Sequence, residues 1–259
     1  ANMPVELKGN ILVTGANRGL GLELVKQLAE TTGQEAHIYA CSREPEGSRT
    51  EFFDIQKTLV IMMCISMHLP VDVADEESIS AAVQAVQDQI GDAGLNILIN
   101  NAGIRKPALS GALSATKKND MMEVYETNVV GPFTIAKMFL PLLKKAAQRD
   151  SSAKGSGMYL FFHVMLNVGY HHWEKTQWSE YILMVSSLNM LTRCQAEDFK
   201  THNIVVTAIH PGWVQTEMGG ENAPLTTVDS VLGMLSVISS LSNKDRGMLL
   251  DWQGNTIPW

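Results

Sequence analysis

The sequence is poor in cysteine and shows no pattern of metal ligands. Its 259 residues include three cysteines, Cys41, Cys64 and Cys194. They are too far apart to form the paired spacings of a zinc site, and no H-E-x-x-H motif occurs. Residues 171–174 contain two histidines and a glutamate but lack a third ligand at a metal-binding spacing. We therefore expect three thiols, which suit a reducing compartment, and no bound metal.

The sequence also lacks an excess of positive charge and a long apolar run. A formal net charge of −7 argues against a general nucleic-acid binder or a binder of anionic membranes. The most apolar stretch, residues 59–67, is too short to span a bilayer and is followed by His68 and Pro70. Because a strand is predicted within the first dozen residues, we expect no signal peptide. A cytoplasmic protein with no nucleic-acid or membrane partner is the default expectation.

The length and composition indicate a globular chain with a sizeable core. Apolar residues make up 45% of the sequence and charged residues 18%. No internal repeat, low-complexity tract or long linker divides the chain. We therefore expect one domain that spans residues 1–259.

Short apolar runs alternate with helical patterns along the chain. The predicted strands are residues 11–14, 37–41, a strand ending near 69–73, 95–100, 158–166, 203–210 and 247–252. The predicted helices are residues 20–30, 77–90, 118–149, 180–200 and 226–241. Pro132 is expected to break or kink the long helix. Alternating strands and helices predict an α/β fold, with a doubly wound parallel sheet and helices on both faces.

A glycine-rich turn joins the first predicted strand to the first predicted helix. Residues 14–21, TGANRGLG, contain Gly15, Gly19 and Gly21 in the spacing G-x-x-x-G-x-G. Glycines allow a tight turn and let the backbone approach a pyrophosphate at the N-terminus of the following helix. Glycines can simply mark turns, but the position between a strand and a helix favours a dinucleotide site. No Gly-Lys-Ser/Thr follows, which excludes a P-loop.

The second predicted strand lacks an acidic residue at its end. A carboxylate there would bind both hydroxyls of the adenosine ribose in NAD(H). The chain instead has Ser42 and Arg43, and Arg18 lies inside the glycine turn. Two guanidinium groups and a hydroxyl suit a 2′-phosphate, so NADP(H) is predicted in preference to NAD(H). Arg43 as a merely solvated charge is the less favoured interpretation, because the acidic residue is also missing.

Further motifs follow in order along the chain, among them NNAG (100–103), HPGWVQT (210–216) and LLDWQGNTIPW (249–259). With the glycine turn they resemble the short-chain dehydrogenase/reductase superfamily, most closely its sniffer-type (C-factor-like) carbonyl reductases. The resemblance covers nearly the whole chain and implies a Rossmann-type fold that binds NADP(H). In this resemblance Asp72 meets the adenine, and Thr216 with its loop holds the carboxamide. The cofactor-binding residues implied are Gly15, Asn17, Arg18, Gly19, Leu20, Gly21, Ser42, Arg43, Asp72, Val73, Asn101, Ala102, Gly103, Pro211, Gly212, Val214 and Thr216.

The resemblance also implies a catalytic group, of which the sequence retains only part. In this family a tyrosine protonates the carbonyl oxygen and a serine hydrogen-bonds it. A lysine four residues after the tyrosine holds the nicotinamide ribose, and an asparagine anchors a water. Tyr181 and Asn128 occupy the places of the tyrosine and asparagine, but Val185 occupies the place of the lysine. No serine occurs from Met158 to Trp178, where the family serine would lie.

Three hypotheses fit this pattern. The first is NADPH-dependent reduction of a small aldehyde or ketone. The second is a catalytically impaired relative that binds NADP(H) and acts as a regulatory protein. The third is alternative splicing or an incorrect gene sequence, since the off-pattern residues cluster in 52–68 and 158–187 while the flanking segments match. We favour reductase ancestry and leave open the substrate and whether the protein forms a homodimer.

Overall fold

A computed structural model describes residues 7–32, 36–44, 65–106, 117–149, 157–162 and 179–258. Within these ranges, only the backbone is described at positions 65, 66, 157–162, 179–183 and 185. Tyr181 and Val185 therefore have a backbone position but no described side chain.

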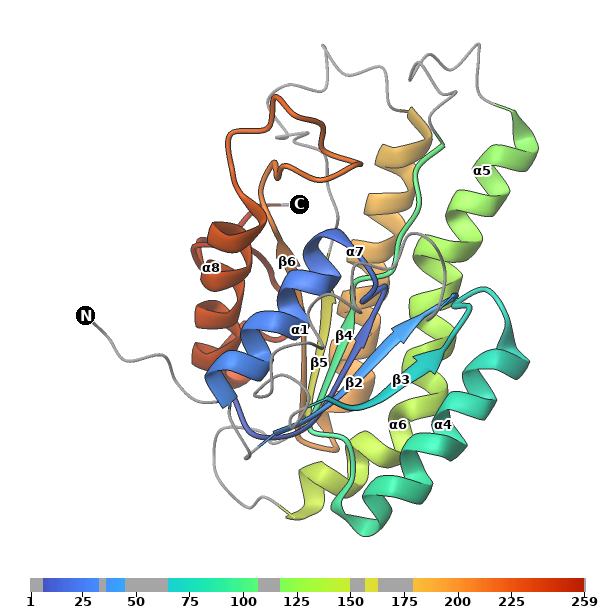
Figure 1. Ribbon diagram of the computed structural model, residues 1–259, viewed down its shortest axis with the longest axis vertical. Helices are drawn as coiled ribbons and strands as arrows, with labels where there is room; N and C mark the ends of the chain where they lie inside the picture. Colours follow the sequence, from blue (N-terminus) through green and yellow to red (C-terminus); the bar gives the residue numbers. More distant parts are fainter. Residues whose placement is uncertain are drawn as a thin grey trace.

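A parallel sheet forms the centre of the fold (Figure 1). Its strands are β1 (Gly9–Thr14), β2 (Ala36–Ser42), β3 (Ile65–Pro70), β4 (Ile97–Asn100), β5 (Gly157–Phe162), β6 (Ile204–His210) and β7 (Leu249–Asp251). They lie in the order β3-β2-β1-β4-β5-β6-β7, and neighbouring strands pair in parallel. The chain changes sides of β1 between β3 and β4. Sheets of this kind bind ligands at such a switch point, outside the carboxyl ends of the strands.

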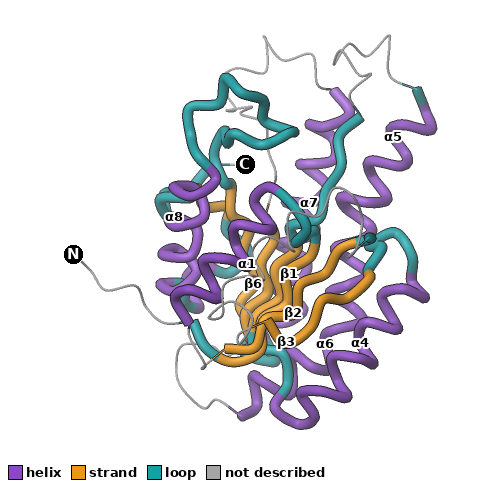
Figure 2. Tube along the Cα trace, in the orientation of Figure 1, coloured by secondary structure: helices purple, strands orange, loops and turns teal. Residues whose placement is uncertain are grey.

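Helices cover both faces of the sheet (Figures 1 and 2). On one face, α1 (Gly19–Thr32) packs beside α8 (Thr227–Ser240). The other face carries α4 (Glu76–Ile90), α6 (Gly131–Arg149) and α7 (Ser179–Lys200), with α5 (Lys118–Tyr125) leading into α6. Three short helical turns, η2 (Gly91–Ala93), η4 (Glu126–Val130) and η6 (Asn243–Asp245), complete the described elements. The predicted doubly wound α/β fold is confirmed.

The central strands are buried on both sides, which explains their continuous apolar sequence. Ile11 and Val13 pack against the α1–α8 layer, whereas Leu12 between them packs on the opposite layer. The same alternation occurs on β2, where Ile38 and Tyr39 face opposite cores. Successive strand side chains point to opposite faces, so each strand contributes to both cores and holds the two layers together.

The predicted long helix over 118–149 is interrupted by a π-helical turn. The turn η4 separates α5 from α6, and the N–H of Gly131 donates to the carbonyl of Glu126, five residues earlier. Pro132 has no N–H, so it cannot supply the α-helical bond to the carbonyl of Asn128. The predicted break is confirmed, and Asn128 lies within it.

A glycine that follows η2 gives a test of how tightly the layers pack. A Cβ on Gly94 would lie 2.3 Å from the backbone N of Ala146 and 2.6 Å from the carbonyl O of Leu142, whereas a Cβ on Gly91 would meet nothing within 4 Å. Both glycines have positive φ, +76° and +55°. We expect Gly94→Ala to lower the free energy of unfolding by about 1–3 kcal/mol more than Gly91→Ala. Urea denaturation of both variants measures the difference, and equal losses would contradict the packing described.

Candidate functional site

The glycine turn is bound to the segment after β4 by buried hydrogen bonds. The hydroxyl oxygen of Thr14, at the end of β1, accepts from the backbone N–H groups of Asn101 (3.1 Å) and Ala102 (3.0 Å). The side-chain amide of Asn101 donates back to the carbonyls of Thr14 (3.0 Å) and Gly15 (3.1 Å). Thr14 and Asn101 are both buried. This junction joins two of the predicted cofactor segments at the switch point of the sheet.

Two of the three glycines in the turn are required by contacts within the chain itself. A Cβ on Gly15 would lie 2.8 Å from the Cα of Ala102, and Gly15 has a φ of +64°. A Cβ on Gly21 would lie 2.1 Å from the carbonyl oxygen of Gly15 and 2.5 Å from the Asn101 amide nitrogen. These glycines therefore let α1 pack closely on the turn. Leu20, which precedes Gly21, is buried in the core.

Gly19 differs from these two glycines because a Cβ added there would meet only ordinary contacts, from the side chain of Thr216. Its φ is +54°, and the nearest atoms to a Cβ added there would be Thr216 Cγ2 at 3.7 Å and Thr216 Cβ at 3.9 Å. α1 begins at Gly19, and the first N–H groups of a helix lack intrahelical acceptors. Asn17 lies half-buried in the same turn. Free N–H groups at a helix N-terminus are the kind of donor that binds an anionic group, and Thr216 lies next to them.

Two polar residues lie at the end of β2, one in contact with another side chain and one exposed to solvent. Ser42 is buried, and its Oγ lies 3.0 Å from Nε2 of His68 on β3. Burial lowers the pKa of His68. Arg43, the next residue, is exposed. Arg43 is thus open to a phosphate, whereas the Ser42 hydroxyl already contacts a histidine that the sequence pattern did not connect with this site.

The segment after β3 rests on the start of α6. The Asp72 carboxylate accepts from the N–H of Ala74 at 3.0 Å, which closes a local turn. Val73 is buried, and a Cβ on Gly131 would lie 2.8 Å from its carbonyl oxygen. Asp72, which the resemblance places at the adenine, and Val73 therefore follow β3 at the carboxyl edge of the sheet, with the Asp72 carboxylate engaged in its own loop.

Asn128 joins three segments at this edge. Its Oδ1 accepts from the N–H of Ile104 (2.8 Å), and its Nδ2 donates to the Ile104 carbonyl (2.9 Å) and to Sδ of Met184 (2.9 Å). A Cβ on Gly103 would lie 3.4 Å from Asn128 Oδ1. The side-chain amide thus ties η4 to Ile104 and Met184, and Pro132 cannot donate to the backbone carbonyl of Asn128.

Met184 relates Asn128 to the predicted catalytic tyrosine. Positions 181 and 184 are three residues apart on α7, so these backbone positions share one face of the helix. Met184 itself is buried against Asn128. The side chains of Tyr181 and Val185 lie outside the described residues, as does the whole of 163–178. The roles assigned to these positions stay predictions.

The loop after β6 begins at a fixed turn. Nδ1 of His210 accepts from the N–H of Gly212 at 2.8 Å, and the Pro211 carbonyl accepts from the buried Ser230 hydroxyl at 2.7 Å. Burial lowers the pKa of His210, and nearby Asp251 partly opposes this effect. A neutral imidazole is required here, because Nδ1 must be unprotonated to accept the Gly212 bond.

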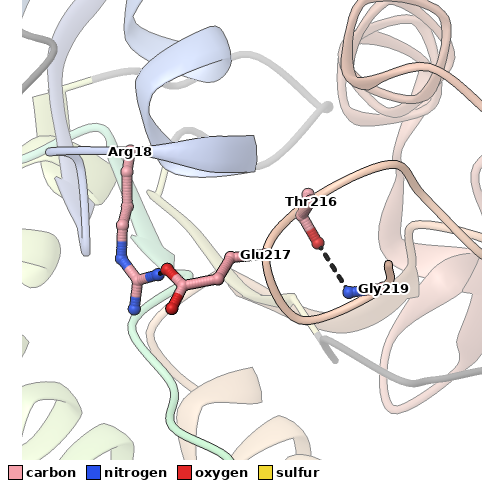
Figure 3. Close-up of polar contacts among 4 residues, drawn as sticks. All are labelled: Arg18, Thr216, Glu217 and Gly219. Carbon is pink, nitrogen blue, oxygen red and sulfur yellow. Dashed lines mark hydrogen bonds and ion pairs between the residues drawn. The ribbon is translucent and has the colours of Figure 1, made fainter. Parts of the chain in front are cut away.

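The same loop then closes a compact turn around Thr216. The Thr216 hydroxyl accepts from the N–H of Gly219 at 3.0 Å (Figure 3), and the Thr216 carbonyl accepts from the N–H of Gly220 at 2.8 Å. The indole N–H of Trp213 donates to the Gly219 carbonyl at 2.8 Å. Val214 is buried and pairs with Leu225 in an isolated bridge. The turn is therefore held mainly by its own hydrogen bonds.

Two arginines connect this loop to the other segments of the site. Arg18 of the glycine turn forms an ion pair with Glu217 (Figure 3). Nη1 of Arg105, after β4, donates to the Met218 carbonyl at 3.0 Å. The sequence predicts that Arg18 binds a 2′-phosphate, but it gives no role in the site to Glu217 or Arg105. Arg18 and Glu217 have opposite charges and lie in two segments of one predicted site. This is the feature of the sequence that could have indicated the ion pair.

The described part of the chain holds neither a candidate metal site nor a candidate membrane span. No group of three or more His, Cys, Asp or Glu residues there is arranged to hold a metal ion. None of the helices in the described ranges is both long enough and apolar enough to cross a membrane. Cys41 and Cys194 are free thiols, and burial raises the pKa of Cys41.

The chain is similar to solved carbonyl reductases over almost its full length. A carbonyl reductase from chicken fatty liver, solved with NADPH bound, shares 36% identity and superposes with a TM-score of 0.88, covering 100% of this chain and 97% of that chain. The carbonyl reductase Sniffer of D. melanogaster shares 31% identity with a TM-score of 0.86, covering 98% of this chain and 100% of that chain.

Comparison with sequences gives the same family. The C-signal protein of Myxococcus xanthus is 35% identical over 167 residues, which is 64% of this chain and 93% of that protein. The sequence profile of the short chain dehydrogenase family matches residues 9–156, more than half of the 259 residues. With the doubly wound sheet and the glycine turn at its switch point, this match shows that the chain belongs to the short chain dehydrogenase family.

Proposed function

We propose that this protein is an NADPH-dependent reductase of small carbonyl compounds. The observation that carries the proposal is the glycine turn at the N-terminus of α1, which Thr14 and Asn101 hold at the switch point of the sheet. Backbone N–H groups at such a turn suit the diphosphate of a dinucleotide. The likeness to a carbonyl reductase solved with NADPH supports both the cofactor and the reaction.

The residues at the carboxyl edge have complementary roles in this proposal. The glycine turn and the N-terminus of α1 would hold the diphosphate, and Arg43 with Arg18 would bind the 2′-phosphate. Asp72 and Val73 would border the adenine. Residues 101–103 and 211–216 would flank the nicotinamide half. When bound, NADPH would supply a hydride to the carbonyl carbon of the substrate.

The proposed proton path uses the residues near α7. Tyr181 would donate its phenolic proton to the carbonyl oxygen as the alcohol forms. Asn128 would hold a replenishing water through its backbone carbonyl, since Pro132 cannot bond to that carbonyl. The side-chain amide of Asn128 would instead keep η4 against Ile104 and Met184.

A second candidate is an NADP(H)-binding regulatory protein with little turnover. Val185 in place of the family lysine and the absence of serine from 158–178 favour this candidate. A free tyrosine has a pKa of about 10, so about one molecule in a thousand is phenolate at pH 7. Alcohol oxidation needs the phenolate and would suffer most, whereas carbonyl reduction starts from the neutral phenol. Loss of the ribose contact and of the serine would still leave the substrate poorly oriented.

The cofactor preference can be tested at Arg43. Wild type is expected to bind NADPH more tightly than NADH, and Arg43→Ala to weaken NADPH binding roughly tenfold with little change for NADH. Titration calorimetry with both cofactors measures this. Arg149→Ala is the control, because Arg149 is an exposed arginine at the end of α6. Equal affinity of wild type for the two cofactors would reject the preference.

Substitution of Gly21 and substitution of Gly19 should affect different properties of the protein, its stability and its cofactor affinity. Gly21→Ala is expected to lower the free energy of unfolding, because its Cβ would overlap the backbone of Gly15. Gly19→Ala adds backbone strain of about 1 kcal/mol at a φ of +54°. It is expected to stay folded but to lose NADPH affinity by on the order of tenfold or more, because its Cβ would stand between the backbone and the proposed diphosphate. Thermal unfolding and NADPH titration separate the two effects. Normal NADPH binding by a folded Gly19→Ala variant would show that the diphosphate lies elsewhere.

The missing lysine gives the test that separates the two candidate functions. Val185→Lys is expected to improve NADPH affinity more than turnover, and Val185→Lys with His163→Ser or Val164→Ser to raise turnover of a simple aldehyde. A lysine four residues after Tyr181 shares its helical face and would favour the phenolate. The control is Ser186→Lys, at an exposed position of α7. It adds the same charge to another face of the helix and should change neither the NADPH affinity nor the turnover.

Oxidation of NADPH, followed by its absorbance, measures turnover of these variants. Wild-type turnover at an ordinary enzyme rate, on the order of 1–1000 per second, would show that Val185 does not stand in for a required lysine. Combined variants that bind NADPH but stay as inactive as wild type would favour the regulatory candidate.

A further inference from the structure

Arg18 is held by a carboxylate that the family resemblance does not assign to the site. Its guanidinium points to Glu217 and pairs with it (Figure 3). Among the described residues, Glu217 is the one side-chain partner of this guanidinium. The proposed function gives the same guanidinium a second anionic partner, the 2′-phosphate of NADP(H).

These two partners belong to opposite sides of β1. The 2′-phosphate would lie by Ser42 and Arg43 at the end of β2, which neighbours β1 on one side. Glu217 lies in the loop after β6, and β6 lies on the other side of β1, beyond β4 and β5. Arg18 extends from the turn between these sides. A move of the guanidinium toward the end of β2 would turn Nη1, which pairs with Glu217, away from the loop after β6.

We propose that Glu217 is a specificity-determining residue that competes with the 2′-phosphate for Arg18. This inference rests on the proposed NADP(H) site. It adds that binding of the cofactor and breaking of the Arg18–Glu217 ion pair are coupled. Binding of NADP(H) withdraws Arg18 from Glu217 and releases this link between the glycine turn and the loop over the site. NAD(H), which has no 2′-phosphate, leaves the ion pair in place.

The loop does not depend on this ion pair for its shape. Its turn is closed by the bonds of Gly219 with the Thr216 hydroxyl and the Trp213 indole, and Arg105 binds the Met218 carbonyl. Removal of the Glu217 charge therefore frees Arg18 while the turn persists. This separation makes Glu217 suitable for mutation.

The exposure of the pair sets the size of the expected effect. The side chains of Arg18 and Glu217 are 40% and 69% exposed. Ion pairs at this exposure change an equilibrium by a factor of roughly two to five. A phosphate with nearly two negative charges can overcome such a competitor, so Glu217 tunes the affinity for NADP(H) without preventing binding.

The test compares Glu217→Gln with Glu221→Gln. Glu221 is exposed in the same loop and carries the same charge, so its variant reports the general effect of removing one negative charge. Dissociation constants for NADPH and NADH are measured by titration calorimetry at low ionic strength. We expect Glu217→Gln to bind NADPH roughly twofold to fivefold more tightly than Glu221→Gln does. For NADH the two variants should agree.

A repeat in an Arg18→Met background isolates the competition. There the advantage of Glu217→Gln over Glu221→Gln for NADPH should vanish. Equal tightening by both variants would overturn the proposal in favour of a general charge effect. Weaker binding of both cofactors by Glu217→Gln would also overturn it, since the pair would then hold the loop over the cofactor. Failure of wild type to bind NADPH would instead reject the proposed function itself.

Discussion

The junction between Thr14 and Asn101 is the constraint on which the rest of the site depends. One hydroxyl oxygen accepts two backbone N–H groups, and one amide donates to two carbonyls. Both side chains are buried, where an unsatisfied donor or acceptor costs about 1–3 kcal/mol. The glycine turn and the segment after β4 therefore keep one mutual position. The close packing of Gly15 and Gly21 follows from that position.

From this junction the site extends to both sides of the sheet. The order of the strands brings the ends of β1, β2, β4 and β6 to one edge, so residues far apart in sequence can border one elongated ligand. The loop after β6 reaches back to the glycine turn through Thr216, which lies nearest to Gly19, and through Glu217. The π-helical turn at Asn128 ties the same edge to α7. The glycine turn and the loop after β6 therefore meet at this edge of the sheet.

Much of the fold was predictable because local patterns and long-range packing agree. Strands such as 11–14 and 203–210 are mostly apolar because both faces are buried, and the glycine turn marks the first crossing from strand to helix. The break before Pro132 was predictable from the missing N–H, but its π-helical form was not, since that depends on packing against Ile104 and Met184. The contacts of Ser42 with His68 and of Arg18 with Glu217 join segments 26 and 199 residues apart. Such pairs depend on strand register and loop path, which the sequence pattern alone does not determine.

In the proposed complex one dinucleotide spans the glycine turn, the segment after β4 and the loop after β6. Hydrogen–deuterium exchange with and without saturating NADPH tests it most directly. Bound NADPH is expected to slow exchange in residues 15–21, 101–104 and 212–219 together, and to leave unchanged residues 91–96, which include η2 at the other end of the sheet. Unchanged exchange in all three segments, or protection confined to a different part of the chain, would contradict it.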